Sequence, residues 1–435
     1  MSVDLRKRHV RLFGCLLLMI ASISPALASP LTLEAALATA DSNHPDIEYA
    51  KAERDSALAD SDIAGSRQDA NIYFEGVLRS GRPSFGNGDF AKDNIVRLTA
   101  RKTLYDFGRS SNAELAAGYE LNAREADLTS ILDQRRIDIM ARYFDVLLAD
   151  MQYTVDNELM SVYFVSFDQG KDRLERGQIS SLELIELESR YQDILEKRNA
   201  SAQKQRLTRA LLANAMNRPE ELPGELEDPK LPGNQRALPV YETLIPILLE
   251  NNPRLLAQHE MLAASQKRLE SLRSETRPVL DAEVQAADYS RPSTTRDNLS
   301  AGLILSWPLY QGNRSDSRLA RELAQFNKLQ ASTEKMKRDL SQALLETCLD
   351  IAQLQNSARS AARKNIDFRD LQLERSRAFY ELELKSNLGT AMVGTAAANM
   401  RARQIEYQLA LSFARLEALI GTPLNQAGNT SRERK

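Results

Sequence analysis

The chain has little of the chemistry on which most metal proteins and disulfide-bonded proteins depend. Its 435 residues include two cysteines, three histidines and one tryptophan, and 6% are aromatic. Two cysteines exclude a disulfide scaffold, and three histidines leave little room for a histidine-rich metal site. The 57 basic and 60 acidic residues give a net charge of −3, which argues against a dedicated nucleic-acid binder. A mean hydropathy of −0.42 is too polar for a bundle of membrane-spanning helices.

Motifs of enzyme chemistry are also missing from the sequence. There is no G-x-S-x-G, no H-E-x-x-H, no phosphate-binding loop and no cluster of histidine and cysteine. The acids Asp281 and Glu283 occupy alternate positions of an expected strand, where they suit a polar lining as well as a catalytic pair. We therefore predict that the protein is not an enzyme and has no catalytic residue, cofactor or metal site.

The first 28 residues have the layout of a secretory signal peptide. Basic residues at positions 6–11 precede an apolar run from Leu12 to Ile23, and Ala26-Leu27-Ala28 provides a cleavage site. The apolar run is too short for a helix that crosses a bilayer. This favours export and cleavage over a retained N-terminal anchor.

The distribution of proline predicts very long helices. No proline occurs between Ser84 and Arg218 or between Leu309 and Thr422, and both windows are rich in strong helix formers. A helix from Arg109 to about Leu174 would reach roughly 100 Å at 1.5 Å per residue. A helix of this length indicates a coiled coil or a helical barrel.

Two pairs of strands are expected between the helical blocks, at about 71–105 and 279–310. From Asn298 to Tyr310, apolar and polar residues alternate, and Leu303, Leu305 and Trp307 share one face. Alternation over about ten residues, with an aromatic residue at one end, suits a strand of an outer-membrane barrel. A hairpin packed on helices is the alternative.

The chain is an internal duplication. His44-Pro45 recurs as Asn252-Pro253 and Leu104-Tyr105 as Leu309-Tyr310. Each half is expected to contain two shorter helices, a strand pair and a long helical hairpin. The expected divisions are a signal peptide (1–28), a first repeat (29–218, hairpin about 109–216), a linker (219–239), a second repeat (240–424, hairpin about 313–420) and a disordered tail (425–435).

Four membrane strands cannot close a barrel, and an open edge is not tolerated in lipid. An exported chain of this kind must therefore pool its strands with other copies. Three copies would supply twelve strands, an even number that such barrels allow, and would also bring the long helices together as a tube.

Taken together, these features resemble the TolC-like outer-membrane efflux protein family, over nearly all of Leu31 to Leu424. The resemblance rests on the duplication, on Leu104-Tyr105-Asp106-Phe107-Gly108 and Pro308-Leu309-Tyr310-Gln311-Gly312, and on the ending Arg415–Leu424. It implies a homotrimer in the outer membrane of a Gram-negative bacterium. Such a trimer has a 12-stranded β-barrel, four strands per chain, continuous with a long periplasmic α-helical barrel. Its partners would be a periplasmic adaptor and an inner-membrane transporter, driven by protons or ATP.

The resemblance also assigns roles to residues at two periplasmic turns. Gly177 matches an adaptor-docking glycine, whereas Glu383 replaces the corresponding glycine of the second turn. The periplasmic gate would use Glu183, Tyr380, Lys385, Gly389 and Met392. Gly389 and Met392 stand where well-studied members carry acids, so no carboxylate ring is expected.

The predicted function is a passive gated exit duct in a tripartite efflux or type I secretion system, with no bound nucleic acid. A periplasmic coiled-coil adaptor or structural protein is the alternative, but it would require one long hairpin and a flanking lipoyl-like module. Neither the cargo nor the class of transporter can be read from the sequence.

Overall fold

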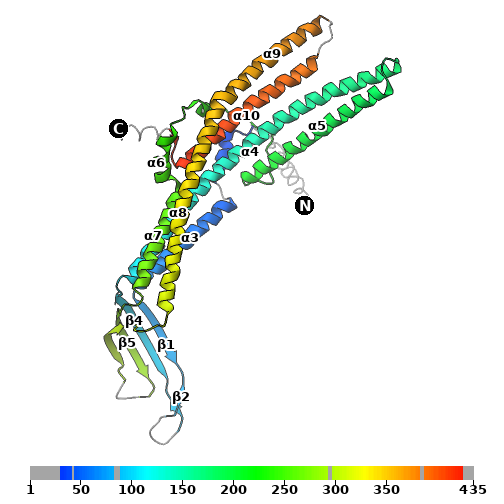
Figure 1. Cartoon of the computed structure of the whole chain (residues 1–435). Coiled ribbons are helices and arrows are strands. Elements are labelled where there is room, and N and C mark those ends of the chain that lie inside the picture. Colours follow the sequence, from blue (N-terminus) through cyan, green and yellow to red (C-terminus); the bar gives the residue numbers. More distant parts are fainter. Residues whose placement is uncertain (1–29, 42–43, 83–88, 292–295, 383–386, 425–435) are drawn as a thin grey trace, which may run out of the picture.

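The protein is an elongated molecule with a small sheet at one end and two long helical hairpins at the other (Figure 1). The computed structural model describes residues 30–41, 44–82, 89–291, 296–382 and 387–424. The expected signal peptide (1–28) and tail (425–435) lie outside these residues. Among the described residues, no helix combines the length and the apolar character needed to span a membrane.

The first half of the chain places two helices before its strands and two after them. Helix α4 runs for 67 residues without a break, as the absence of proline allows. Its end is one residue beyond the expected Leu174. The elements are α2 (Leu33–Leu37), α3 (Pro45–Gly65), η1 (Ser66–Gln68), β1 (Asn71–Val77), β2 (Ser80–Gly81), β3 (Ala91–Lys92), β4 (Ile95–Tyr105), α4 (Arg109–Glu175) and α5 (Ser181–Ala215).

The second half repeats the order of the main helices and strands. Its long helix contains a π-helical segment of five residues, which the sequence did not indicate. The elements are η2 (Pro232–Gln235), α6 (Tyr241–Asn251), α7 (Pro253–Arg273), β5 (Val279–Tyr289), β6 (Leu299–Ser306), α8 (Arg314–Gln353), the π-helix η3 (Leu354–Ala358), α9 (Arg359–Glu381) and α10 (Leu388–Ile420).

Corresponding helices begin and end in similar ways in the two halves. His44 caps α3 and Asn252 caps α7, each with a side chain that accepts a backbone N–H, and a proline follows each cap. This is a common start for a helix, since proline has no N–H to leave unpaired. Gly421, which ends α10, has φ +67°, and a Cβ there would lie 2.1 Å from the carbonyl oxygen of Asn251. No side chain fits at that position.

The main sheet has the strand order β1-β4-β5-β6, and each neighbouring pair is antiparallel. The two halves meet at the centre of the sheet, where β4 pairs with β5 along nearly its whole length. Strands β1 and β6 are therefore the two edges. The expected strand end at Tyr310 was too far along the chain, because β6 ends at Ser306. Pro308 has no N–H to continue the ladder beyond Ser306.

The helices form two layers that repeat the arrangement of the sheet. Near the sheet, α4 and α7 are central and are flanked by α3 and α8. Toward the far end, α4 and α10 are central and are flanked by α5 and α9. In each layer one outer helix comes from the first half of the chain and the other from the second half. Helix α4 runs through both layers (Figure 1).

The densest packing lies in the middle of the molecule, where the segment between the halves crosses the helices. The rings of Phe144 and Tyr407 stack at 4.5 Å between centroids, which joins α4 to α10. The Tyr143 hydroxyl lies 2.7 Å from the carbonyl oxygen of Leu31 and 2.6 Å from that of Glu227. Burial raises the pKa of Tyr143 to about 12, so this hydroxyl keeps its proton and ties both segments to α4.

Candidate functional site

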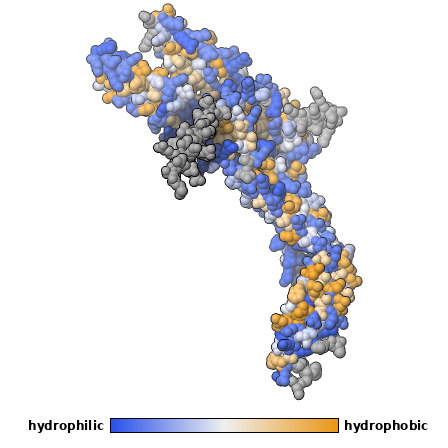
Figure 2. Space-filling view, turned by 180° about the vertical axis from the view of Figure 1, so that it is seen from behind, coloured by the Kyte–Doolittle hydropathy of each residue, from blue (hydrophilic) through white to orange (hydrophobic). Residues whose placement is uncertain are grey.

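One face of the sheet is exposed to the surroundings and is apolar except for Lys102 on β4, which pairs with Ala282. Leu303 and Leu305 are each 67% exposed and Trp307, just beyond β6, is 60% exposed. The strand pairing places Leu303 beside Ala282 and Leu305 beside Leu280. Figure 2 shows hydrophobic residues gathered over this end of the molecule. Other exposed apolar residues of the same face are Ile72, Phe74, Val96, Leu98, Val284 and Leu299.

The opposite face of the sheet carries charged and polar side chains that bond across the strands. Arg97 on β4 pairs with Glu75 on β1 at 3.1 Å. Arg101 pairs with Glu283 on β5, and the Thr103 hydroxyl donates to Asp281 at 2.8 Å. Because side chains alternate along a strand, this polar face lies directly behind the apolar one. A sheet with one exposed apolar face and one charged face suits a boundary between lipid and water.

The first helical tip lies between α4 and α5, at the end of the molecule far from the sheet (Figure 1). Gly177 has φ +69° and open space around its α-carbon, so the backbone there is accessible. Ser180 caps α5: its hydroxyl accepts the N–H of Glu183 at 3.2 Å, and the Glu183 carboxylate accepts the N–H of Ser180 at 2.7 Å. This backbone hydrogen bond, more than any other interaction, lowers the pKa of Glu183.

The second helical tip lies between α9 and α10, at the same end of the molecule (Figure 1). Tyr380 is 66% exposed in the last turn of α9, and Met392 is 47% exposed in the first turns of α10. Glu383 and Lys385 lie outside the described residues. Within one chain no hydrogen bond joins the described residues Glu183 and Tyr380, and the Glu183 carboxylate bonds to Ser180. The roles of these two residues in the gate stay predictions.

Gly389 marks a close approach between the two hairpins. A Cβ at this position would lie 2.7 Å from Cγ2 of Val162 on α4. Valine in a helix has one strongly preferred rotamer, so Val162 has little freedom to move aside. The start of α10 therefore packs on α4 through a glycine that admits no larger side chain without movement.

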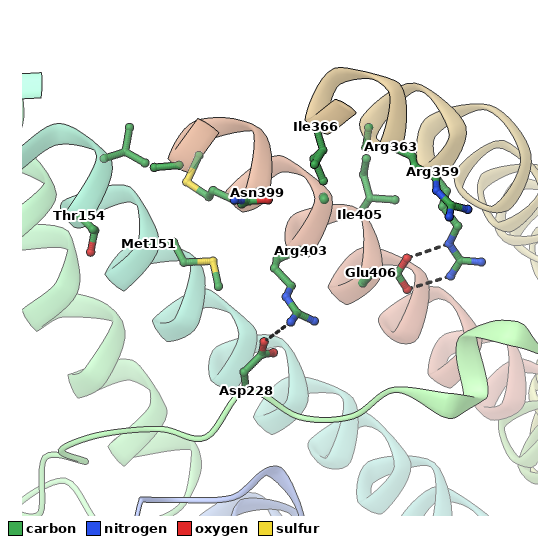
Figure 3. Close-up of a pocket in the computed structure, with 15 residues that line it drawn as sticks. Met151, Thr154, Asp228, Arg359, Arg363, Ile366, Asn399, Arg403, Ile405 and Glu406 are labelled. Atoms are coloured by element: carbon green, nitrogen blue, oxygen red, sulfur yellow. Dashed lines mark hydrogen bonds and ion pairs between the residues drawn. The ribbon is translucent and has the colours of Figure 1, made fainter. Parts of the chain in front are cut away.

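A groove of about 630 Å³ lies between α4, α9 and α10, next to the segment that links the halves (Figure 3). Arg403 on α10 pairs with Asp228 of this segment at 2.9 Å, and both guanidinium contacts from Arg359 to Glu406 are 2.8 Å. Figure 3 shows both ion pairs among the residues that line the groove. The apolar side chains Met151 and Ile366 also contribute to the lining.

These ion pairs hold the linking segment against the helices. The Asn234 amide donates to both the backbone carbonyl and the carboxylate of Glu406, each at 2.8 Å. Burial acts to raise the pKa of Glu406, but the hydrogen bonds from Arg359 and Asn234 outweigh it and lower the pKa. Sequence reasoning missed this cluster, because its members come from three separate segments and share no motif. In the described part of the chain, no group of histidine, cysteine and acidic residues could hold a metal ion.

Comparisons with known proteins agree with this geometry. Residues 244–422 match the family of outer membrane efflux proteins. No curated protein matches the chain by sequence. The fold is similar to that of CusC, with 18% identity, a TM-score of 0.70 and coverage of 90% of this chain and 92% of the other.

Two further solved structures have the same fold. The outer membrane protein VceC from Vibrio cholerae is 14% identical, with a TM-score of 0.73 and coverage of 90% of this chain and 96% of the other. The outer membrane channel CmeC from Campylobacter jejuni is 13% identical, with a TM-score of 0.73 and coverage of 92% and 88%. The predicted resemblance and the combination of long helices with a four-stranded sheet are confirmed.

Proposed function

We propose, on the premise that this chain is an outer-membrane efflux protein, that three copies form a gated exit duct across the outer membrane. The duct would receive cargo from a periplasmic adaptor and an inner-membrane transporter, and it would perform no reaction of its own. The observation that supports this most directly is that the sheet and both helical layers end in unpaired edges.

The edges of the sheet need partners, because unpaired N–H and C=O groups are costly in lipid. One edge, β1, comes from the first half of the chain and the other, β6, from the second half. A contact between β1 of one copy and β6 of the next is therefore head-to-tail, and such contacts build rings. Eight strands from two copies would enclose an interior filled by side chains, whereas twelve from three copies leave more room for water. The charged face of the sheet would line that interior.

The outer helices supply matching edges for the same ring. On α9, Phe368 and Leu371 are 57% and 66% exposed, and on α5, Leu182 and Ile185 are 75% and 61% exposed. On α9, Arg375 and Phe379 continue this spacing of three or four residues, which keeps these side chains on one face of the helix. A neighbouring copy that covers these side chains would complete a tube of helices beneath the strands.

The tips of the hairpins would form the gate and the adaptor site. We assign the gate to Glu183, Tyr380, Lys385, Gly389 and Met392, and adaptor docking to Gly177 and Glu383. An adaptor that binds the open tips more tightly than the closed tips would shift the population toward the open duct. The energy for export would come from the inner-membrane transporter, whether the cargo is a small molecule or a protein of a type I secretion system.

The test is the mass of the purified mature protein in detergent together with its conductance in a planar bilayer. A trimer with a small resting conductance is the expected result. A monomer that carries no current would overturn the duct, and the coiled-coil adaptor would become the better explanation of the helices.

A further inference from the structure

An arginine-lined cavity of about 500 Å³ lies where the sheet meets the helices. Its lining comes from the starts of α4 and α8, from the segment between α7 and β5, and from the end of β6. The charged residues are four arginines and one glutamate. The lining residues are Arg109, Glu275, Arg277, Val279, Ser306, Pro308, Gln311, Arg314 and Arg318.

The cavity opens on the polar face of the sheet. Val279 on β5 pairs with Ser306 on β6. Two residues along each strand, Asp281 pairs with Ile304, and both of these positions lie on the polar face. Leu280 and Leu305, which point to the apolar face, are not part of the lining. Because successive side chains alternate between faces, the strand residues in the lining face the same way as Arg101 and Glu283.

The positive charge of the cavity is only partly neutralised. Glu275 lies 2.6 Å from Arg318 and 3.6 Å from Arg109, and its side chain is 12% exposed. Among the described residues, neither Arg277 nor Arg314 has an acidic partner within ion-pair distance, and Arg277 lies 5.6 Å from the ring of Phe107. The nearest strand acid on this face, Asp281, accepts a hydrogen bond from Thr103 at 2.8 Å.

Two long helices also begin at this cavity. Arg109 is the first residue of α4 and Arg314 is the first residue of α8. At α4 the Asp106 carboxylate already accepts the N–H of Ser110 at 2.8 Å, so the start of this helix adds little to the attraction of the arginines for an anion. Arginine also fits phosphate and carboxylate oxygens with paired N–H groups.

We propose that this cavity binds phosphate or carboxylate groups of solutes that pass through the duct, so that the protein favours anionic cargo. The inference rests on the proposed trimeric duct, in which three such cavities surround the passage at the base of the strands. Arg277 and Arg314 are the principal binding groups, since their charges are not used by acids of the same chain. Glu275 and Arg318 neutralise each other and form part of the cavity wall, together with Arg277 and Arg314.

The test uses the full mature trimer in a planar bilayer, with inorganic pyrophosphate as the probe, added at the side of the strand loops. From that side the anion reaches the cavity without passing the helical tips. Pyrophosphate should block the current, and the double variant Arg277→Gln/Arg314→Gln should be blocked about tenfold less tightly. The preference of the current for chloride over potassium should fall in the same variant.

The matched control is Arg338→Gln, which removes the same charge from an exposed position of α8 about 36 Å from Arg314 along the helix. Its block should equal that of the original protein. A conducting trimer whose block and ion preference are unchanged in the double variant overturns the anion site but not the duct. Retention of a phospholipid by the original trimer but not by the double variant, measured by native mass spectrometry, would assign the cavity to lipid and overturn its role in transport. A monomer without current overturns the duct and this inference together.

Discussion

An arginine at Leu303 should prevent stable insertion of the sheet, whereas an arginine at the neighbouring Gly302 should not. Leu303 is the fifth of the eight residues of β6 and is 67% exposed on the apolar face. Gly302 lies at nearly the same depth on the polar face, with nothing within 4 Å of where a Cβ would stand. The two substitutions therefore add the same side chain at the same level, one toward lipid and the other toward water.

The expected cost follows from depth and copy number. An arginine on the lipid face near the middle of a barrel costs about 2–4 kcal/mol. Three copies in one trimer would raise the total to about 6–12 kcal/mol, if the distant sites add independently. A typical domain is stable by only about 5–15 kcal/mol. Leu303→Arg should therefore leave most of the protein uninserted.

The assay is urea unfolding of the protein reconstituted in lipid, followed by the fluorescence of Trp307, the one tryptophan of the chain. Trp307 directly follows β6, so its signal reports on this part of the sheet. Leu303→Arg should lower the urea midpoint strongly and Gly302→Arg little. Equal loss in both variants, or no loss in Leu303→Arg, would refute the assignment of this face to lipid.

Three further predictions concern the tips and the middle of the molecule. Gly389→Ala should raise the resting conductance, because the added methyl group would lie 2.7 Å from Val162. Gly394→Ala is the control, because the nearest atom there belongs to the flexible end of Arg369, at 3.3 Å. Equal conductance in the two variants would contradict the prediction. The capping interaction of Glu183 should be lost in acid. The pKa of the Glu183 carboxyl group is lowered from an ordinary value of 4.5. The cap is therefore fully present above pH 4.5 and disappears as the pH falls through the lowered pKa. Amide exchange in the first turn of α5 should then accelerate, and Glu183→Gln should abolish this pH step; a step that persists in the variant would belong to another group. Tyr407→Phe should lower the free energy of unfolding by about 1–3 kcal/mol, because it removes a 2.7 Å hydrogen bond to Asp228. Thermal unfolding of the trimer measures this loss. An unchanged midpoint would show that the ion pair with Arg403 is enough to satisfy Asp228.

The lengths of the helices and the two faces of the strands could be predicted from the amino-acid sequence. A window without proline over 135 residues permits one continuous helix, and α4 extends from Arg109 to Glu175 as expected. Strand β5 begins at Val279, where the second strand pair was expected to begin. These features depend on local chemistry: proline ends helices, and side chains alternate along a strand. Both signals are present in any short stretch of the chain.

Only the tertiary structure decided which segments meet. The pairing of β4 with β5 joins strands about 180 residues apart, and no local pattern specifies that register. The same holds for the contact of Gly389 with Val162 and for the bond of Glu406 to Arg359 and Asn234. Glu183 shows the converse, because a local capping box of four residues, Ser180 to Glu183, engages a carboxylate that the family resemblance assigned to the periplasmic gate.

The arginine-lined cavity could be predicted from the sequence only in part. Arg109 and Arg314 occupy equivalent positions of the duplication, five residues after each Leu-Tyr pair begins. That repeat was visible in the sequence and could have drawn attention to both residues. Their shared cavity with Arg277 and Arg318 exists only because two long helices start beside the same strand ends. Sequence periodicity sets where each element begins, but the charge of a cavity depends on which element ends are brought together in space.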